Sequence, residues 1–346
     1  MKRFIISLAL MLFTGAIVSA QSYYNEQWLA KQKIFSTMEE ALGNIDNCVV
    51  LDLSNHSLTS VPSQISQLKS LKAIYLQGNS ITELPAELCQ LTELRYIFAD
   101  QNAISKIPAE ISNLKKLKRI SLANNRISDF SPLCNCSALE SITMSNNLIT
   151  TVPANIADLK TLKELDLSFN KITAFQTAIT NIKTLESLML AGNSITTIPA
   201  TVVNLKSLKV LYLDNNKVRD MTQLCNVTTL TRLSLSGCGI TVIPVKISQL
   251  SQLQRLILSH NSITSFPKSL TQVTSLIYLD LSNNKLTTLP NDVSLLTNLY
   301  DFNLCNNLFA QFPELLQNLP ALKAVGVSGN KTEMVPPMLG YERELY

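Results

Sequence analysis

Side chains capable of catalysis are few and scattered in this sequence. Only two histidines, His56 and His260, occur among 346 residues. A catalytic centre needs an acid, a base or a nucleophile that converge on one place, and the many serines have no histidine at a matching level of the repeat described below. We find no Gly-rich phosphate loop, nucleophile elbow or metal-ligand spacing in the sequence. The sequence therefore predicts no catalytic residue, no metal site, no cofactor and no enzymatic activity.

The seven cysteines also favour structure over chemistry. Cys48, Cys134 and Cys225 stand where other parts of the chain carry leucine or another apolar residue. Cysteines at such positions act as small hydrophobic side chains. We therefore expect buried thiols, with Cys305 as the most exposed, and we expect Cys134 and Cys136 to be too close in sequence for an easy disulfide.

A repeated pattern sets the position of every residue named so far. The stretch LDLSFNKIT begins at Leu165, and related stretches begin at Leu211 (LYLDNNKVR), Leu256 (LILSHNSIT) and Leu279 (LDLSNNKLT). Aligned on this motif, the chain divides into thirteen units with a step of 23 residues, or 22 in two cases. The units start at Cys48, Leu71, Leu94, Leu117, Leu139, Leu162, Leu185, Leu208, Leu230, Leu253, Leu276, Leu299 and Leu322.

Each unit predicts a short strand followed by a helical return. Apolar and polar residues alternate from Leu165 to Ser168, as in a half-buried strand. In the return, Leu84, Leu88 and Leu91 recur at helical spacing, with Pro85 at the first turn. Parallel strands about 4.8 Å apart are closer than helices, which pack at about 8–10 Å. The stack must therefore bend with its sheet on the inside.

The unit pattern, approximately L-x-x-L-x-L-x-x-N-x-L-x-x-L-P-x-x-I-x-x-L-x-x, resembles the leucine-rich repeat family of the 23-residue type over residues 48–335. The resemblance implies an α/β solenoid, a curved horseshoe with a parallel sheet on the concave face and short helices or 3-10 turns on the convex face.

A recurring asparagine is predicted to hold the turn after each strand. Its amide offers two donors and an acceptor to backbone groups that have no partner in the sheet. Asn170 is one example, and His56 and Cys238 replace the amide in two units. The full set is Asn79, Asn102, Asn125, Asn147, Asn170, Asn193, Asn216, Asn261, Asn284, Asn307 and Asn330.

The two ends carry separate signals. Residues 1–20 have a basic start, an apolar run and a small residue, Ala20, at the expected cleavage point, which is typical of a secretory signal peptide. Its apolar run is too short for a membrane span. Residues 21–47 are expected to form an N-terminal helical cap, with Trp28, Ile34, Phe35, Met38 and Leu42 at helical spacing. Residues 336–346 are expected to form a C-terminal cap or tail.

Binding is expected on the concave face, where the third, fifth and seventh residues of each unit point outward. Two groups of large or charged residues stand out there. The second patch combines aromatics, arginines and carboxylates, the residue types that anchor interfaces, whereas strand propensity alone explains the first equally well. The first patch holds Tyr75, Tyr96, Phe98, Asp100 and Arg119, bordered by Gln77. The second patch holds Tyr212, Asp214, Arg232, Arg255, Ile257, Tyr278, Asp280 and Asp301.

These features predict an exported binding protein whose partner is another protein. A net charge of +4 with interspersed signs does not favour nucleic acid, and no segment after the signal peptide is expected to span a membrane. An adhesion or host-interaction role is implied only by the resemblance, as is a bacterial-type protein that is secreted, at the cell surface or periplasmic. Glycan binding on the first patch and a passive envelope scaffold are the alternatives.

Overall fold

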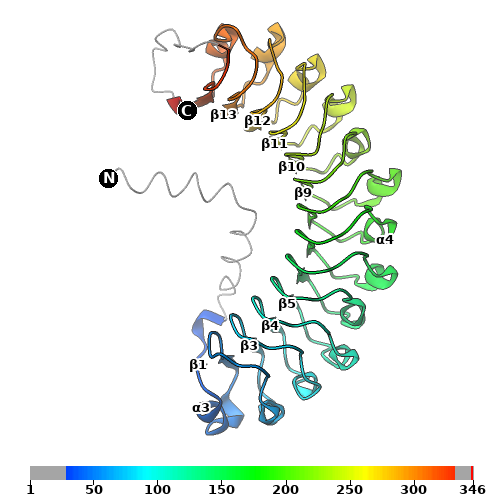
Figure 1. Cartoon of the computed structure of the whole chain (residues 1–346), viewed down its shortest axis with the longest axis vertical. Helices are drawn as coiled ribbons and strands as arrows, with labels where there is room; N and C mark the ends of the chain where they lie inside the picture. The colour runs from blue at the N-terminus through cyan, green and yellow to red at the C-terminus, as the bar shows by residue number, and fades with distance from the viewer. Residues whose placement is uncertain (1–28, 332–343, 346) are drawn as a thin grey trace.

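The computed structural model describes residues 29–331 and 344–345, and its main element is one parallel sheet of 15 strands in sequence order. Figure 1 shows the strands along the inside of an arc. Neighbouring strands pair without slippage, so that Leu165 lies opposite Leu188 and Leu188 opposite Leu211. The strands are β1 (Ile34–Phe35), β2 (Val50–Asp52), β3 (Ala73–Tyr75), β4 (Tyr96–Phe98), β5 (Arg119–Ser121), β6 (Ser141–Thr143), β7 (Glu164–Asp166), β8 (Ser187–Met189), β9 (Val210–Tyr212), β10 (Arg232–Ser234), β11 (Arg255–Ile257), β12 (Tyr278–Asp280), β13 (Asp301–Asn303), β14 (Ala324–Gly326) and β15 (Glu344–Leu345).

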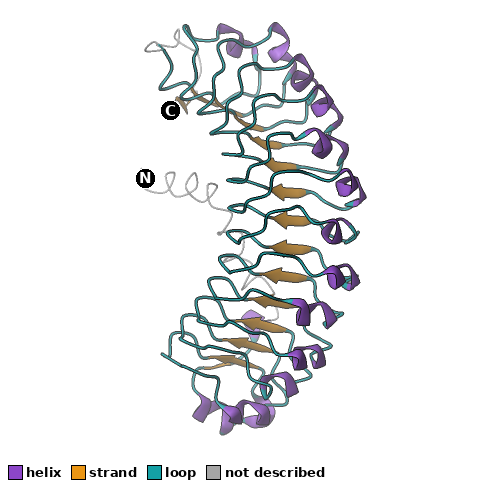
Figure 2. Cartoon of the chain, turned by 45° about the vertical axis from the view of Figure 1, so that its right-hand side comes forward, coloured by secondary structure: helices purple, strands orange, loops and turns teal. Residues whose placement is uncertain are grey.

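Short helices cover the outer side of the arc (Figure 2). Those of the array are 3-10 helices except for one α-helical turn, α4 (Thr177–Thr180). The 3-10 helices are η3 (Ser63–Gln67), η4 (Leu88–Gln90), η5 (Ala109–Asn113), η6 (Ser131–Asn135), η7 (Ala154–Asp158), η8 (Ala200–Asn204), η9 (Thr222–Asn226), η10 (Val245–Gln249), η11 (Lys268–Gln272), η12 (Asn291–Leu295) and η13 (Glu314–Asn318). The prediction of a curved leucine-rich repeat solenoid is confirmed.

The recurring proline lies just before the return helix, not inside its first turn. Pro62 has extended backbone angles (φ −58, ψ 134) as the N-cap of η3. Its carbonyl oxygen accepts a hydrogen bond from the Ile65 amide at 3.0 Å. The two 22-residue units lack this proline, and there an aspartate one residue before the N-cap accepts a hydrogen bond from the first amide of the helix. Asp129 accepts from the Ser131 amide and Asp220 from the Thr222 amide, both at 2.8 Å.

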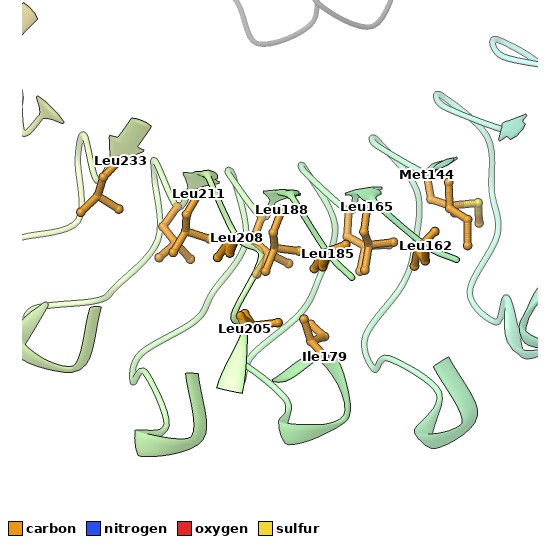
Figure 3. Close-up of a cluster of buried hydrophobic side chains, with 14 of the residues drawn as sticks. Met144, Leu162, Leu165, Ile179, Leu185, Leu188, Leu205, Leu208, Leu211 and Leu233 are labelled. Atoms are coloured by element: carbon orange, nitrogen blue, oxygen red, sulfur yellow. The ribbon is translucent and has the colours of Figure 1, made fainter. Parts of the chain in front are cut away.

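The asparagines lie in the predicted place and make the predicted bonds. Asn170 is 9% exposed, and its side-chain nitrogen donates to the carbonyls of Met144 (2.9 Å) and Leu167 (3.0 Å). Its side-chain oxygen accepts from the Ile149 amide at 3.0 Å. Where cysteine replaces the amide, the Cys238 thiol donates to the Leu213 carbonyl at 3.2 Å. The leucine slots form a continuous core between sheet and helices, part of which Figure 3 shows around Leu165, Leu188 and Leu211.

The segment before the array is less helical than its spacing predicts. Its described elements are η1 (Leu29–Lys31), β1, α3 (Met38–Leu42) and η2 (Ile45–Asn47). Ile34 and Phe35 form a strand on the first edge of the sheet because their backbones pair with Val50 and Leu51. Thr37 caps α3 by accepting from the Glu40 amide, and Gly43 is the C-cap that ends the helix.

Several expectations concern residues outside the described ranges. These are the signal peptide at 1–20, Trp28 and most of the tail at 336–346. In the part of the chain that is described, every helix is too short or too polar to cross a lipid bilayer.

Candidate binding surface on the concave face

The second patch brings two arginines and a tyrosine side by side on neighbouring strands. Arg232 lies opposite Arg255, Arg255 opposite Tyr278, and Tyr278 opposite Asp301. The Arg255 guanidinium carbon is 3.8 Å from the centre of the Tyr278 ring, a cation–π contact. All six ion pairs found among the described residues involve other side chains, so neither arginine is neutralised there by a carboxylate. Adjacent like charges on a sheet repel.

The Tyr278 hydroxyl remains protonated at any physiological pH. Partial burial raises the pKa of its hydroxyl far above the usual range, and Asp280 adds to the rise. The Arg255 charge opposes this rise without cancelling it. The phenol therefore offers a neutral hydrogen-bonding group and a ring face rather than a negative charge.

Two carboxylates of the second patch are already engaged in holding the turns. Asp214 accepts from the Ser236 amide at 2.7 Å and from the Ser234 hydroxyl. Burial raises the pKa of Asp214, while these two hydrogen bonds act in the opposite direction. Asp280 is 3% exposed and accepts from the Ser282 amide at 2.9 Å. These two carboxylates are therefore less available to a partner than Arg232, Arg255, Ile257 and Tyr278.

Sequence reasoning missed two exposed apolar residues beside this patch. Ile277 is 45% exposed and Tyr300 is 53% exposed. They lie on neighbouring strand starts, where the Tyr300 amide donates to the Ile277 carbonyl at 2.8 Å. Both are the second residue of their unit, and in most units that residue is a lysine, an arginine, a glutamate or another polar residue. An alignment of the units shows the change to apolar residues next to Tyr278 and Asp301. These residues extend the surface toward the side of the sheet where the strands start.

An open polar hollow of about 730 Å³ adjoins the patch toward the ends of strands β10–β14. It is lined by fifth- and seventh-position residues and by eighth-position residues. We call the eighth residue of each unit the rim residue, and the row of these residues the rim. Ser236 and Ser259 bond through their hydroxyls at 3.0 Å, and Asp280 forms part of the floor. Asn215, His260, Asn283 and Asn306 are the rim residues that border the hollow. Apart from Cys305, the residues that line it are polar.

The first patch is not an exposed aromatic platform. Tyr75, Tyr96 and Phe98 are only 3%, 3% and 1% exposed. Tyr75 stacks on Phe98 with ring centres 4.9 Å apart, and Leu29 belongs to the same buried cluster. Asp100 accepts hydrogen bonds from Ser121 (2.5 Å) and the Ala123 amide (2.7 Å). Packing on neighbouring strands, which the unit pattern alone does not reveal, places these side chains in a secondary core.

The residues considered for chemistry lie apart. His56 replaces an asparagine and its Nδ1 lies 2.7 Å from the Ser54 carbonyl, while His260 is on the rim nine units later. All seven cysteines are free and buried, and Cys305, which was expected to be the most exposed, has the highest exposure at only 8%. Cys305 is covered because the Ser328 hydroxyl contacts its sulfur at 3.2 Å. Among the described residues no group of three or more His, Cys, Asp or Glu side chains is arranged to hold a metal.

Comparison with known proteins places this geometry in a family. The model of the leucine-rich repeat region matches residues 36–135. The leucine rich repeat model matches residues 115–172, 160–218 and 228–286. No curated protein sequence matches the chain.

Solved structures show the same architecture in bacteria and plants. An internalin from Listeria monocytogenes superimposes with a TM-score of 0.79 at 25% identity, covering 89% of this chain and 88% of its own. A leucine-rich repeat protein of Leptospira interrogans gives 0.61 at 27% identity, covering 91% and 100%. A plant peptide hormone receptor in complex with RGF2 gives 0.68 at 26% identity, covering 86% of this chain and 54% of the receptor. With its family-model matches, its register and its asparagine ladder, the chain belongs to the leucine-rich repeat family.

Proposed function

We propose that this protein is an exported, non-enzymatic binding protein that recognises another protein through its concave face. The contact surface consists of Arg232, Arg255, Ile257 and Tyr278, together with the flanking Ile277 and Tyr300. The observation that supports it most directly is the pair of adjacent arginines without a carboxylate partner in the described chain. A partner that places carboxylates between them removes a repulsion and gains charge-assisted hydrogen bonds.

The apolar residues supply the remaining part of the surface. Aromatic and arginine side chains dominate the binding energy of protein interfaces, and Tyr278 already holds the Arg255 guanidinium against its ring. Ile277 and Tyr300 add exposed apolar area on the strand-start side. The plant receptor, which shares the fold, is in complex with RGF2, and this supports a peptide or protein partner.

The N-terminal sequence supports a location outside the cytoplasm. Residues 1–20 have the pattern of a cleaved secretory signal, and the structural relatives include an internalin. We place the protein outside the cytoplasm, as a secreted, surface or periplasmic component, where binding serves adhesion or contact with a host protein. A glycan-binding role needs exposed ring faces at Tyr75, Tyr96 and Phe98, and these rings are buried.

Cross-linking capture from the native environment tests the proposal. We expect wild type to enrich a specific protein and Arg255→Glu and Tyr278→Ala each to reduce its recovery at least tenfold, as loss of an interface anchor does. Lys246→Glu is the matched control, since it makes the same charge change on the exposed side of the convex helix η10. Equal recovery with Arg255→Glu and with Lys246→Glu would contradict the assignment of this surface.

A further inference from the structure

The rim residue adopts a left-handed backbone in every one of the thirteen units. Its φ angle lies between +54° and +69° throughout. Glycine and asparagine adopt this conformation most readily, and other polar residues less so. The rim consists of Asn55, Gly78, Gln101, Asn124, Asn146, Phe169, Gly192, Asn215, Gly237, His260, Asn283, Asn306 and Gly329. Phe169 is the single bulky apolar residue in this set.

Hydrogen bonds hold the backbone at Phe169 and on both sides of it. The Phe169 amide donates to the Ala191 carbonyl at 2.6 Å. On one side the Ser168 amide donates to Asp166 at 2.9 Å, and on the other side Asn170 is fixed by its buried hydrogen bonds. A left-handed φ of +54° is unfavourable for a phenylalanine. Asparagine, which occupies six other rim positions including the one in the preceding unit, would form this turn more easily. The turn therefore gives no reason why a phenylalanine stands here.

The ring is exposed on one face and supported on the other. Phe169 is 52% exposed. It lies against the rim residue of the next unit, where a Cβ on Gly192 would be 2.4 Å from the Phe169 Cδ1 atom. Only glycine at 192 leaves room for the ring in this orientation. The result is an aromatic side chain that is held in place before any partner arrives, which lowers the entropy lost on binding.

The surroundings of Phe169 are apolar and basic. Leu148, in the preceding unit, is 40% exposed. On the loops that follow the rim in the units from Leu117 to Leu208, the charged residues are the cations Arg126, Lys171, Lys217 and Arg219 and the carboxylates Asp129 and Asp220. Both carboxylates accept backbone hydrogen bonds at the helix starts. None of the four cations takes part in an ion pair within the described ranges.

We propose that Phe169 is the anchor of a second protein-binding surface, formed on the rim with Leu148, Arg126, Lys171 and Lys217. The partner is a protein segment that packs an apolar side chain against Phe169 and carries carboxylates on either side of it. A bulky residue in an unfavourable conformation that the surrounding structure enforces is an indication of function, and the unpaired cations select the charge of the partner. The surface lies five units from Tyr278, about 24 Å at one strand spacing per unit, and does not depend on the concave-face proposal.

The first test measures stability, because a structural and a recognition role predict opposite results. Phe169→Asn installs the residue that is most common on the rim. We expect a Tm equal to or above that of wild type, since strain is relieved and no core contact is lost. A Tm lowered by several degrees would show that the ring stabilises the fold and would overturn the proposal.

The second test measures recognition with a defined probe. Phage-displayed random 12-residue peptides are selected on the purified protein and counter-selected on Phe169→Asn, and the enriched peptides are then synthesised and titrated by fluorescence polarisation. We expect an apolar residue flanked by Asp or Glu, at least tenfold weaker binding to Phe169→Asn, several-fold weaker binding to Lys171→Glu, and unchanged binding to Phe169→Tyr. Arg255→Glu, which tests the concave patch, should leave these peptides bound. Absence of enriched peptides, or equal binding to wild type and Phe169→Asn, would overturn the proposal.

Discussion

Asn170 illustrates how one side chain makes an inward turn of the backbone possible. It pairs one amide hydrogen-bond donor and two carbonyls that water does not reach. Each buried polar group left unpaired costs about 1–3 kcal/mol. Asn170→Ala should therefore lower the free energy of unfolding by about 3 kcal/mol, measured as a shift of the urea midpoint. Asn291→Ala, an exposed site at the start of η12, should change it by less than about 0.5 kcal/mol. Similar effects at both sites would show that the ladder contributes little.

The sequence predicted the role of a single residue wherever the same residue type recurs at the same position of the unit. The asparagine ladder was predictable because its column is nearly uniform, and in the two exceptions the side chains of His56 and Cys238 still contact backbone carbonyls. The engagement of Asp214 and Asp280 was not predictable, since it depends on which way each carboxylate turns. The rim column was equally visible but was not recognised, because a left-handed φ becomes apparent only when the Asn, Gly and His residues are viewed as one set.

At the scale of elements, the return helices of the two 22-residue units begin with an additional side-chain hydrogen bond. In most units a proline carbonyl accepts the bond that closes the first turn. In the 22-residue units the carbonyls of Phe130 and Met221 accept this bond, and an aspartate accepts a further bond from the first amide of the helix. The hydrogen bonds from Thr222 hold the pKa of Asp220 below its usual range. This contribution to stability is present above the unfolded pKa and is lost as the pH falls through the folded value.

Asp220→Ala should accordingly destabilise the protein by about 1 kcal/mol, the usual effect of losing a helix cap. Asp220→Asn keeps an oxygen acceptor and should retain most of the stability at neutral pH. Thermal unfolding of both variants at pH 7 and pH 3 checks this, and the difference between Asp220→Ala and wild type should shrink at the lower pH. A constant difference would rule out the carboxylate as its source.

The elements themselves were largely predictable, and their types were less so. Apolar spacing identified a helical return in each unit but did not distinguish a 3-10 helix from α4, because four or five residues contain too little periodicity. Before the array, Ile34 and Phe35 have helical spacing in the sequence but form a strand. The edge of β2 would otherwise lack hydrogen-bond partners, and their backbones pair with it. Burial of Tyr75 against Phe98 likewise depends on neighbours in space.

At the scale of the whole molecule, buried thiols distributed along the array link its stability to alkaline pH. Burial raises the pKa of Cys48, Cys136 and Cys238 to about 11 and of Cys89, Cys134 and Cys225 to about 12, from an ordinary value of 9.0. For Cys89, Cys134 and Cys225 nearby carboxylates add to the rise. A raised folded pKa gives stability that is complete below the unfolded pKa and is lost as the pH rises toward the folded one.

Stability should therefore decline between about pH 9 and pH 12, by at most about 1.4 kcal/mol per pH unit for each thiol. Denaturant unfolding of wild type and Cys225→Ala across this range checks the contribution, and the decline should be shallower in the variant. Ellman's reagent should react with the thiols only after unfolding. Parallel pH profiles for the two proteins would show that other groups cause the decline.

The uniform register of the sheet has a consequence for how the two proposed surfaces relate. Because each unit pairs with the next at the same position, insertion of a complete unit between the unit of Lys217 and the unit of Arg232 would leave both surfaces intact and increase only their separation, by about 4.8 Å per unit. The array then acts as a molecular ruler. A ligand that spans both surfaces would tolerate few such changes in length, whereas two independent ligands would be indifferent to them.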